Sequence, residues 1–402
     1  MAIHQYNFPT RIQFGPEAIR LLPDALKEAG RQRPLLVTDK QLAELRPITG
    51  TRKVVDDAGL DPAVFSGIWG NPVKSQVTAG VEAYRKHGAD SVVALGGGAA
   101  IDVAKAIILM VNHPGDLFDY EDGKPGARPI DREIPTFFTV PTTAGTGSEV
   151  GRSTVISDDQ SHVKKIIFSP RLLASRVFVD PDLTLGLPAK VTAATGMDAL
   201  THLVEAYLAK GYHPMSDGIA LEGLRLLSRN LATCVDFAQQ IEAGDRELVS
   251  DEDHRQARGA MLNAALMGGV AFQKGLGVTH SLAHALSTVC DLHHGLANGI
   301  CIPYAMAFNQ DAVPERMADL ARAVDAKPAT GAGFLAWLAE LKHAVGIPRS
   351  LAEVGVRADQ IPQLVEIAVA DGCHANNPRP VTAADFQDLF KAAIQGTVSG
   401  AQ

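Results

Sequence analysis

The chain lacks several features that mark specialised classes of protein. Its 402 residues include only four cysteines, none in a Cys-x-x-Cys pair, so a disulfide-stapled scaffold is excluded. No run of five basic residues occurs and the formal net charge is −8, which argues against a nucleic-acid partner. The first residues form no signal peptide, and the apolar stretch at residues 104–111 is too short to span a bilayer. We expect a cytoplasmic protein whose partners include neither nucleic acid nor a membrane.

The sequence falls into two halves with different patterns. Apolar runs alternate with stretches of helical spacing in the first half, which predicts strands at 34–39, 91–95, 136–140 and 177–180 and helices at 77–86 and 101–111. From about Pro188 the pattern is almost wholly helical, with helices expected at 189–210, 215–231, 253–272 and 280–289. We therefore predict an α/β domain with a parallel sheet over residues 1–185 and an all-α domain over residues 186–402. Ligands are expected beyond the carboxyl ends of the strands, facing a cleft between the domains.

A run of three glycines, residues 96–98, lies between a predicted strand and a predicted helix. Glycines let the backbone approach a pyrophosphate closely, and the start of the helix offers unpaired N–H groups and a positive dipole end. The run matches neither the GxGxxG nor the GxxxxGK[ST] pattern. A tight turn that binds nothing is the alternative.

Two further features of the first half suit a nucleotide. Residues 141–149 follow a predicted strand and are rich in hydroxyls and small side chains, which fit contacts to ribose, phosphate or a carboxamide. Asp39 ends the first predicted strand, where a carboxylate can accept from both ribose hydroxyls and repel a 2′-phosphate. The alternatives are a hydroxyl-rich turn and an Asx turn or helix cap.

The helical half carries a pattern typical of metal ligands. Asp198 and His202 are four residues apart, as are His280 and His284, and this spacing places each pair on one helix face. A histidine pair, residues 293–294, follows shortly. A carboxylate with several imidazoles suits Fe²⁺, Zn²⁺ or Mn²⁺. Spacing alone leaves open which of the later histidines bind, and Glu205, one turn beyond His202, is a candidate acceptor behind the ligands.

These motifs together resemble the iron-containing (group III) alcohol dehydrogenases. The resemblance runs in order through residues 96–105, 141–149, 196–202, 275–295 and 377–379. Within the family it is similar to members that reduce lactaldehyde or oxidise 4-hydroxybutyrate. It implies the dehydroquinate synthase-like fold, in which an α/β dinucleotide-binding domain precedes an all-α metal-binding domain.

The resemblance also implies a role for particular residues. The positions that match the family's metal ligands are Asp198, His202, His280 and His294. His284 matches the histidine that relays a proton near the nicotinamide. The positions that match contacts to NAD are Asp39, Asn71, Gly97, Gly98, Ala99, Asp102, Thr142, Thr143, Thr146 and Lys164. Ala99 replaces a serine that the family commonly has there, so one hydroxyl is lost.

Two cations depart from the family's usual residues and raise the question of the substrate. Lys274 lies six residues before His280, and Arg152 closely follows residues 141–149. Together they could hold an anionic tail, which favours an ω-hydroxy acid such as 4-hydroxybutyrate. By resemblance Ser153 and Cys373 line the same pocket. Internal or surface ion pairs are the alternative role of the two cations.

We expect an NAD-dependent, divalent-metal-dependent alcohol dehydrogenase or aldehyde reductase that transfers hydride reversibly on a small primary alcohol. A substrate of the lactaldehyde or 1,2-propanediol type, or a generic short-chain alcohol, is the nearest alternative. A dehydroquinate synthase-like lyase and a non-catalytic binding protein are competing hypotheses, which the complete ligand set disfavours. By resemblance the enzyme is expected to be a homodimer.

Overall fold

The computed structural model describes residue 8 and residues 10–398. Residues 1–6, on which the expectation of no signal peptide rests, lie outside the described part. The chain divides into two compact units, of which one comprises residues 8–143 and 147–186. The other comprises residues 187–398 with the short segment 144–146. We call them the sheet unit and the helical unit.

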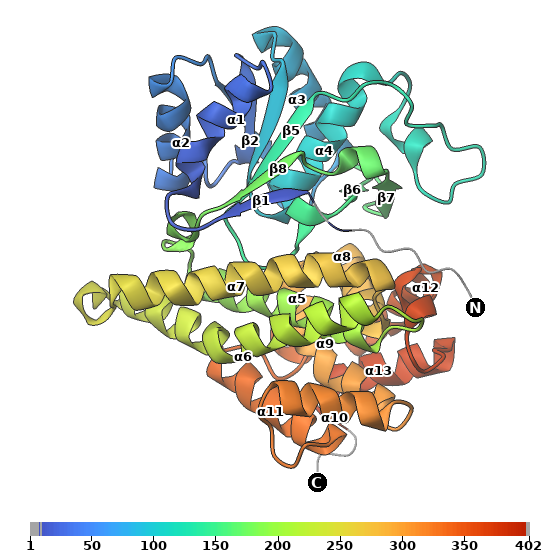
Figure 1. Ribbon diagram of the computed structural model, residues 1–402. Helices are drawn as coiled ribbons and strands as arrows, with labels where there is room; N and C mark the ends of the chain where they lie inside the picture. The colour runs from blue at the N-terminus through green and yellow to red at the C-terminus, as the bar shows by residue number, and fades with distance from the viewer. Residues whose placement is uncertain (1–7, 9, 399–402) are drawn as a thin grey trace. The chain divides into compact units, whose positions relative to one another are not determined.

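The sheet unit is built on six parallel strands (Figure 1). In spatial order they are β1 (Arg11–Phe14), β8 (Arg176–Val179), β5 (Thr136–Pro141), β4 (Ser91–Gly96), β2 (Pro34–Asp39) and β3 (Ala63–Ile68). Helices α1 (Leu22–Glu28) and α2 (Arg46–Asp57) lie on one side of the sheet, and α3 (Lys74–His87) and α4 (Gly98–Asn112) lie on the other. Because β4 is central, all of its residues are buried, which explains its unbroken apolar sequence.

The register of the sheet brings three predicted strands together at one edge. β4 pairs with β2 on one side and with β5 on the other, so Gly96 lies opposite Pro141. The carboxyl ends of these strands therefore lie side by side, as in other parallel sheets that bind ligands there. Asp39, the glycine run and the hydroxyl-rich segment all follow these strand ends.

The helical unit is organised around α5 (Ala189–Leu208), in which every residue except Lys190 and Val191 is buried. The other helices are α6 (Pro214–Ala243), α7 (Asp251–Ala271), α8 (Val278–Cys290), α9 (His294–Asn309), α10 (Pro314–Ala323), α11 (Gly331–Ala344), α12 (Ile361–Ala370) and α13 (Ala383–Gln395). α9 passes so close to α5 that a Cβ on Gly295 would lie 2.3 Å from the Ala194 carbonyl oxygen. Only glycine permits this approach, which brings the start of α9 beside Asp198.

The predicted fold class is confirmed: a parallel-sheet α/β part precedes a helical part. The four expected strands are present, but the sequence did not reveal β1, β3 or the antiparallel hairpin of β6 (Ser153–Ser157) and β7 (Lys164–Phe168). α6 runs twelve residues beyond its expected end, 243 against 231, because no glycine or proline stops it before Gly244.

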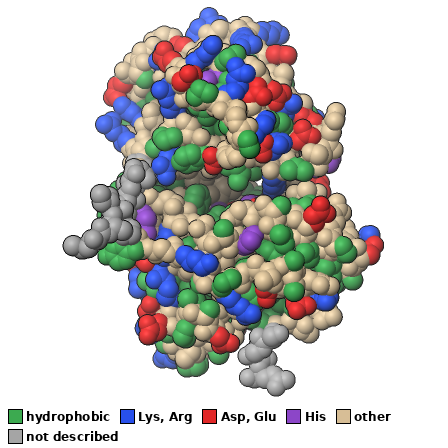
Figure 2. All heavy atoms as spheres, turned by 90° about the vertical axis from the view of Figure 1, so that its right-hand side faces the viewer, with side chains coloured by type: hydrophobic (Ala, Val, Ile, Leu, Met, Phe, Trp, Pro, Cys, Tyr) green, Lys and Arg blue, Asp and Glu red, His purple; other side chains and the backbone are tan. Residues whose placement is uncertain are grey.

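Two observations describe the helices and the surface. Among the described residues no helix is both long and apolar enough to cross a bilayer. Figure 2 shows acidic and basic side chains interspersed on the face that it draws.

Candidate metal centre and dinucleotide loop

Three of the predicted metal ligands converge in the helical unit. Asp198 on α5, His280 on α8 and His294 at the start of α9 each offer one ligand atom, and these atoms lie within 4.8 Å of one another. His202 follows Asp198 by one turn of α5 and falls outside this group of three. Its ring nevertheless stacks on that of His280, with 4.7 Å between the ring centroids. The helix spacing places Asp198 and His202 on one face of α5, and the packing of α8 and α9 brings His280 and His294 to it.

Two buried ring nitrogens of this cluster have unfilled hydrogen-bonding capacity. Nδ1 of His202 and Nε2 of His280 have no hydrogen-bond partner among the described residues. Burial also lowers the pKa of His202 to about 4, so its imidazole is neutral at physiological pH. Buried polar atoms are nearly always paired, and a neutral imidazole nitrogen with a free lone pair is what a metal ion requires.

Glu205 orients His280 from behind. Its carboxylate accepts a hydrogen bond from Nδ1 of His280 at 2.6 Å and others from the backbone N–H groups of Thr279 and Gly277. Burial would raise the pKa of Glu205, but the hydrogen bond and charge of His280 and these N–H donors outweigh it and lower the pKa. With Nδ1–H bound to Glu205, Nε2 carries the lone pair in the neutral form of His280.

Asn298 is a neighbour of the cluster that the sequence analysis missed. It is fully buried on α9, and its side-chain NH₂ donates to Oδ1 of Asp198 at 2.7 Å. The same nitrogen lies 3.1 Å from Nε2 of His294. Asn298 follows His294 by four residues, so the helix spacing was a signal that could have found it.

His284 lies beside the cluster, with its ring stacked on that of His294 at 5.1 Å between centroids. Its Nδ1 is 2.7 Å from Oδ2 of Asp371, a residue that the sequence analysis did not single out. Cys373, predicted to line the substrate pocket, also lies here: His284, Asp371 and Cys373 offer ligand atoms within 4.8 Å of one another. Burial, and then the nearby carboxylates, raise the pKa of the Cys373 thiol well above its usual value.

In the sheet unit, the predicted dinucleotide residues gather at the ends of β2, β4 and β5. Gly97 caps α4, which begins at Gly98, so the first turn of the helix points unpaired N–H groups out of the loop. A Cβ on Gly97 would lie 3.2 Å from Oγ1 of Thr143, and the N–H of Thr142 donates to the Gly96 carbonyl. Oγ1 of Thr142 is buried with no hydrogen-bond partner among the described residues. This arrangement leaves backbone donors and a hydroxyl for a ligand.

Asp39 joins this loop from the end of β2. Its carboxylate accepts a hydrogen bond from the N–H of Gly97. Burial raises the pKa of Asp39 to about 6, and the hydrogen bonds from backbone N–H groups offset part of that rise. The carboxylate therefore lies beside the glycine run and is mostly ionised at pH 7.

Asp102, predicted to contact the cofactor, uses both carboxylate oxygens inside the sheet unit. Oδ1 accepts from Oγ of Ser148 at 2.6 Å, and Oδ2 accepts from the N–H of Val155 at 3.1 Å. Three residues on, the fully buried Lys105 donates to the carbonyls of Ser148, Gly151 and Ser153. These contacts favour a role in ordering the segment after residues 141–147 over direct contact with a cofactor.

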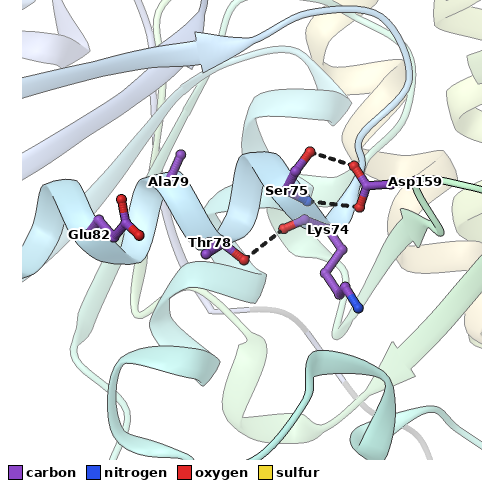
Figure 3. Close-up of a pocket in the computed structure, with 6 residues that line it drawn as sticks. All are labelled: Lys74, Ser75, Thr78, Ala79, Glu82 and Asp159. Atoms are coloured by element: carbon purple, nitrogen blue, oxygen red, sulfur yellow. Dashed lines mark hydrogen bonds between the residues drawn. The ribbon is translucent and has the colours of Figure 1, made fainter.

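Two of the other predicted cofactor residues lie near Ser157, whose N–H donates to the carbonyl of Pro72, next to Asn71, and which pairs with Lys164 across the β6–β7 hairpin. Asn71 precedes α3, Lys164 begins β7, and Thr146 belongs to the segment 144–146 of the helical unit. An open hollow of about 390 Å³ lies along α3. Figure 3 shows the residues that line it, among which Ser75 donates twice to Asp159. None of the predicted site residues lines this hollow.

The two cations proposed to hold an anionic substrate have partners within their own units. The side chain of Lys274 is 2% exposed, and its Nζ lies 2.5 Å from Oδ1 of Asp217 and 2.9 Å from the Tyr207 carbonyl. These contacts favour the alternative role of Lys274, an internal ion pair. Arg152 lies over the ring of Phe168 at 5.3 Å, and the carbonyl of Ser153 accepts from Lys105.

Comparison with known proteins covers nearly the whole chain. Residues 9–181 match the family described as iron-containing alcohol dehydrogenase, and residues 192–394 match the C-terminal part of the Fe-containing alcohol dehydrogenase family. A 1,3-propanediol dehydrogenase from Citrobacter freundii is 36% identical, over 97% of this chain and 98% of that protein. A 4-hydroxybutyrate dehydrogenase from Cupriavidus necator is 37% identical, over 98% of this chain and 100% of that protein.

Solved structures agree with these matches. A 1,3-propanediol oxidoreductase superposes with a TM-score of 0.90 at 34% identity, over 98% of this chain and 100% of that chain. A sulfoacetaldehyde reductase from Bifidobacterium kashiwanohense, solved in complex with NAD⁺, superposes with a TM-score of 0.86 at 27% identity, over 98% and 99% of the two chains.

Proposed function

The chain belongs to the iron-containing alcohol dehydrogenase family, and on that premise we propose that it interconverts small primary alcohols and aldehydes with NAD and a divalent metal ion. One observation carries the proposal: Asp198, His280 and His294 converge within 4.8 Å, with the ring of His202 stacked against them. The buried ring nitrogens without hydrogen bonds support a cation as the missing partner.

The donor set suits the proposed metal. Three imidazoles and one carboxylate are typical ligands of Fe²⁺, with Zn²⁺ or Mn²⁺ as alternatives. Such a cation supplies Lewis acidity toward the substrate oxygen. Glu205 fixes the tautomer of His280, and Asn298 orients the carboxylate of Asp198 through a hydrogen bond to Oδ1.

The sheet unit suits a dinucleotide. We propose that Gly97, Gly98 and Ala99 hold the pyrophosphate at the start of α4, and that Thr142 and Thr143 contact it from the neighbouring strand end. NAD supplies the hydride acceptor. The Asp39 carboxylate, placed beside Gly97, accepts hydrogen bonds from the ribose hydroxyls and repels a 2′-phosphate. Asn71, Thr146 and Lys164 remain predicted contacts, and Asp102 acts through Ser148 and Val155.

We propose that the two units have different roles. Residues 1–185 bind NAD, and residues 186–402 bind the metal and carry His284, which relays the hydroxyl proton of the alcohol. That the enzyme works as a homodimer in the cytoplasm stays a prediction.

We propose a small neutral primary alcohol as the substrate. The Lys274 side chain is 2% exposed and bonds to Asp217, which also pairs with Arg316, and to the Tyr207 carbonyl, so its ammonium group is directed into the helical unit and not toward a substrate. Arg152 is the remaining candidate for an anion contact, and the similarity to a 4-hydroxybutyrate dehydrogenase keeps an ω-hydroxy acid as the second candidate.

Metal reconstitution tests the reaction. We expect protein loaded anaerobically with Fe²⁺ to oxidise NADH stoichiometrically with short aldehydes, and His202→Ala to lose bound metal and at least about 10³-fold in kcat. His343→Ala, on the exposed face of α11, is the control and should keep both. A His202→Ala protein with full metal content and activity would contradict the proposed centre.

A second measurement separates the two substrates. The ratio of kcat/KM for succinate semialdehyde to that for butanal is compared between wild type and Arg152→Gln. We expect the ratio to stay within about threefold, because a neutral substrate needs no cation. A fall of about tenfold or more, the size of one charge-assisted hydrogen bond, would favour the ω-hydroxy acid instead.

A further inference from the structure

Asp371 and His284 form a half-buried pair that neither the metal cluster nor the dinucleotide loop requires. Asp371 directly follows α12, and its Oδ2 lies 2.7 Å from Nδ1 of His284 on α8. The other oxygen, Oδ1, accepts from Oγ of Ser281 at 2.7 Å and from the N–H of Cys373 at 2.9 Å. Each oxygen of the carboxylate therefore has its own partner.

The direction of every hydrogen bond in this group follows from its neighbours. Oγ of Ser281 accepts from the N–H of His374 at 3.0 Å, so its own hydrogen is directed to Asp371. The N–H of Cys373 can only donate. Burial would raise the pKa of Asp371, but the hydrogen bonds and charge of its partners, His284 first, outweigh burial and lower the pKa well below its usual value. An ionised carboxylate only accepts, so Nδ1 of His284 carries the hydrogen.

We propose that Asp371 is a positioning residue, which fixes the orientation of the His284 ring and holds it in the Nδ1–H tautomer. Nε2 is then the nitrogen with a lone pair, and it is the atom that receives the hydroxyl proton of the alcohol and passes it to water. The proton alone moves in this step, and the Asp371 carboxylate stabilises the imidazolium while it exists. The inference rests on the proposed function, because that function gives His284 its relay role.

The same three groups could instead bind a second metal ion, because His284, Asp371 and Cys373 also lie within 4.8 Å. Two observations disfavour this alternative. The Cys373 thiol stays protonated, since burial raises its pKa, and it is hydrogen-bonded to Asp371. Both Asp371 oxygens already accept hydrogen bonds from protein donors.

Asp371→Asn tests the tautomer with little change in shape. Ser281 and Cys373 both donate, so the amide oxygen should stay with them and the NH₂ should face His284. Nδ1 then becomes an acceptor and Nε2 carries the hydrogen, which blocks proton uptake. We expect kcat to fall about 10²- to 10⁴-fold, with KM and metal content within about threefold. Asp388→Asn, on the exposed face of α13, should leave all three unchanged.

A double-mutant cycle tests whether Asp371 acts through His284. If it does, adding Asp371→Asn to His284→Ala lowers kcat no further. If the two losses in kcat multiply in the double variant, Asp371 acts independently of His284, which overturns the inference. Ser281→Ala removes one donor but keeps the Asp371–His284 bond, and we expect it to lower kcat less than tenfold. If Ser281→Ala lowers kcat as much as Asp371→Asn does, the order of the loop that carries Asp371 explains the loss, and the inference is again overturned.

A spectroscopic readout requires no activity. Long-range ¹H–¹⁵N spectra of metal-free, ¹⁵N-histidine protein, with His284 assigned from the His284→Ala spectrum, should show protonated Nδ1 in wild type and protonated Nε2 in Asp371→Asn. An unchanged tautomer overturns the positioning role. Full kcat in His284→Ala would instead refute the relay in the proposed function, so the two failures are distinguishable.

Discussion

Buried carboxylates behave in opposite ways in the two units. In the helical unit Glu205 and Asp371 each face a histidine and several N–H or O–H donors, and these partners lower the pKa of both groups in spite of burial. In the sheet unit burial prevails: it raises the pKa of Asp39 to about 6 and that of Glu149 to about 7. The depth of burial is similar, so the partners decide the outcome.

The difference matches what each unit is proposed to bind. An ionised carboxylate behind a histidine orients the ring and partly balances a cation in front of it. In the sheet unit burial favours the protonated carboxyl groups, and the charges of Lys105 and Lys164 at Asp102, and of Lys105 at Glu149, offset it only in part. The metal side of the site is therefore built with fixed charge, and the dinucleotide side with carboxyl groups that titrate near neutral pH.

Glu205→Gln is expected to break this contrast with the largest effect. The glutamine amide has only one oxygen that can accept hydrogen bonds, so it cannot serve His280 and the N–H groups of Gly277 and Thr279 together. The His280 ring therefore loses its fixed tautomer. We expect Zn²⁺ affinity, measured by competition with a chromophoric chelator, to fall about 10- to 100-fold. Glu366→Gln on the exposed face of α12 is the matched control. Equal affinity in wild type and Glu205→Gln would show that Glu205 is only structural.

The sequence predicted the residues that helix spacing connects and missed those that the tertiary fold connects. Asp198 and His202 share a face of α5 because they are four residues apart, and this is legible without a structure. Asp371 lies 87 residues beyond His284 in a loop, where no periodicity marks it. For the same reason the sequence left open whether Lys274 contacts a substrate or forms an ion pair: its partner Asp217 is 57 residues away.

The same limit applies to the strands. The fully buried β4 shows an unbroken apolar run and was predicted, whereas the half-buried β3 and β7 show neither a continuous run nor strict alternation. Their pairing comes from neighbours far along the chain, so local pattern carries little of it.

Asp39→Ser sharpens the contrast from the side of the sheet unit. Loss of the carboxylate removes charge-assisted hydrogen bonds to the ribose and the repulsion of a 2′-phosphate. We expect the ratio of kcat/KM for NADPH to that for NADH to rise about 10- to 100-fold, the size of one or two such bonds. Because the pKa of Asp39 is about 6, KM for NADH in wild type should also rise as pH falls through 6, and not in Asp39→Ser. Asp24→Ser, an exposed change on α1, should alter neither; an unchanged ratio in Asp39→Ser would place the ribose elsewhere.

Glu149→Gln probes the sheet unit with the smallest effect, on stability. The pKa of Glu149 is about 7 in the folded protein against 4.5 for an exposed carboxyl, so between these values the folded state keeps a proton that the unfolded state releases. The free energy of unfolding therefore falls as pH rises from 4.5 to 7, by at most about 1.4 kcal/mol per pH unit.

Glutamine does not titrate, so the Tm of Glu149→Gln relative to wild type, measured by calorimetry, should rise between pH 5 and pH 7. Glu44→Gln, an exposed change, should give a flat difference. A flat difference for Glu149→Gln as well would mean that Glu149 ionises as an exposed carboxyl does, and the contrast between the two units would no longer include it.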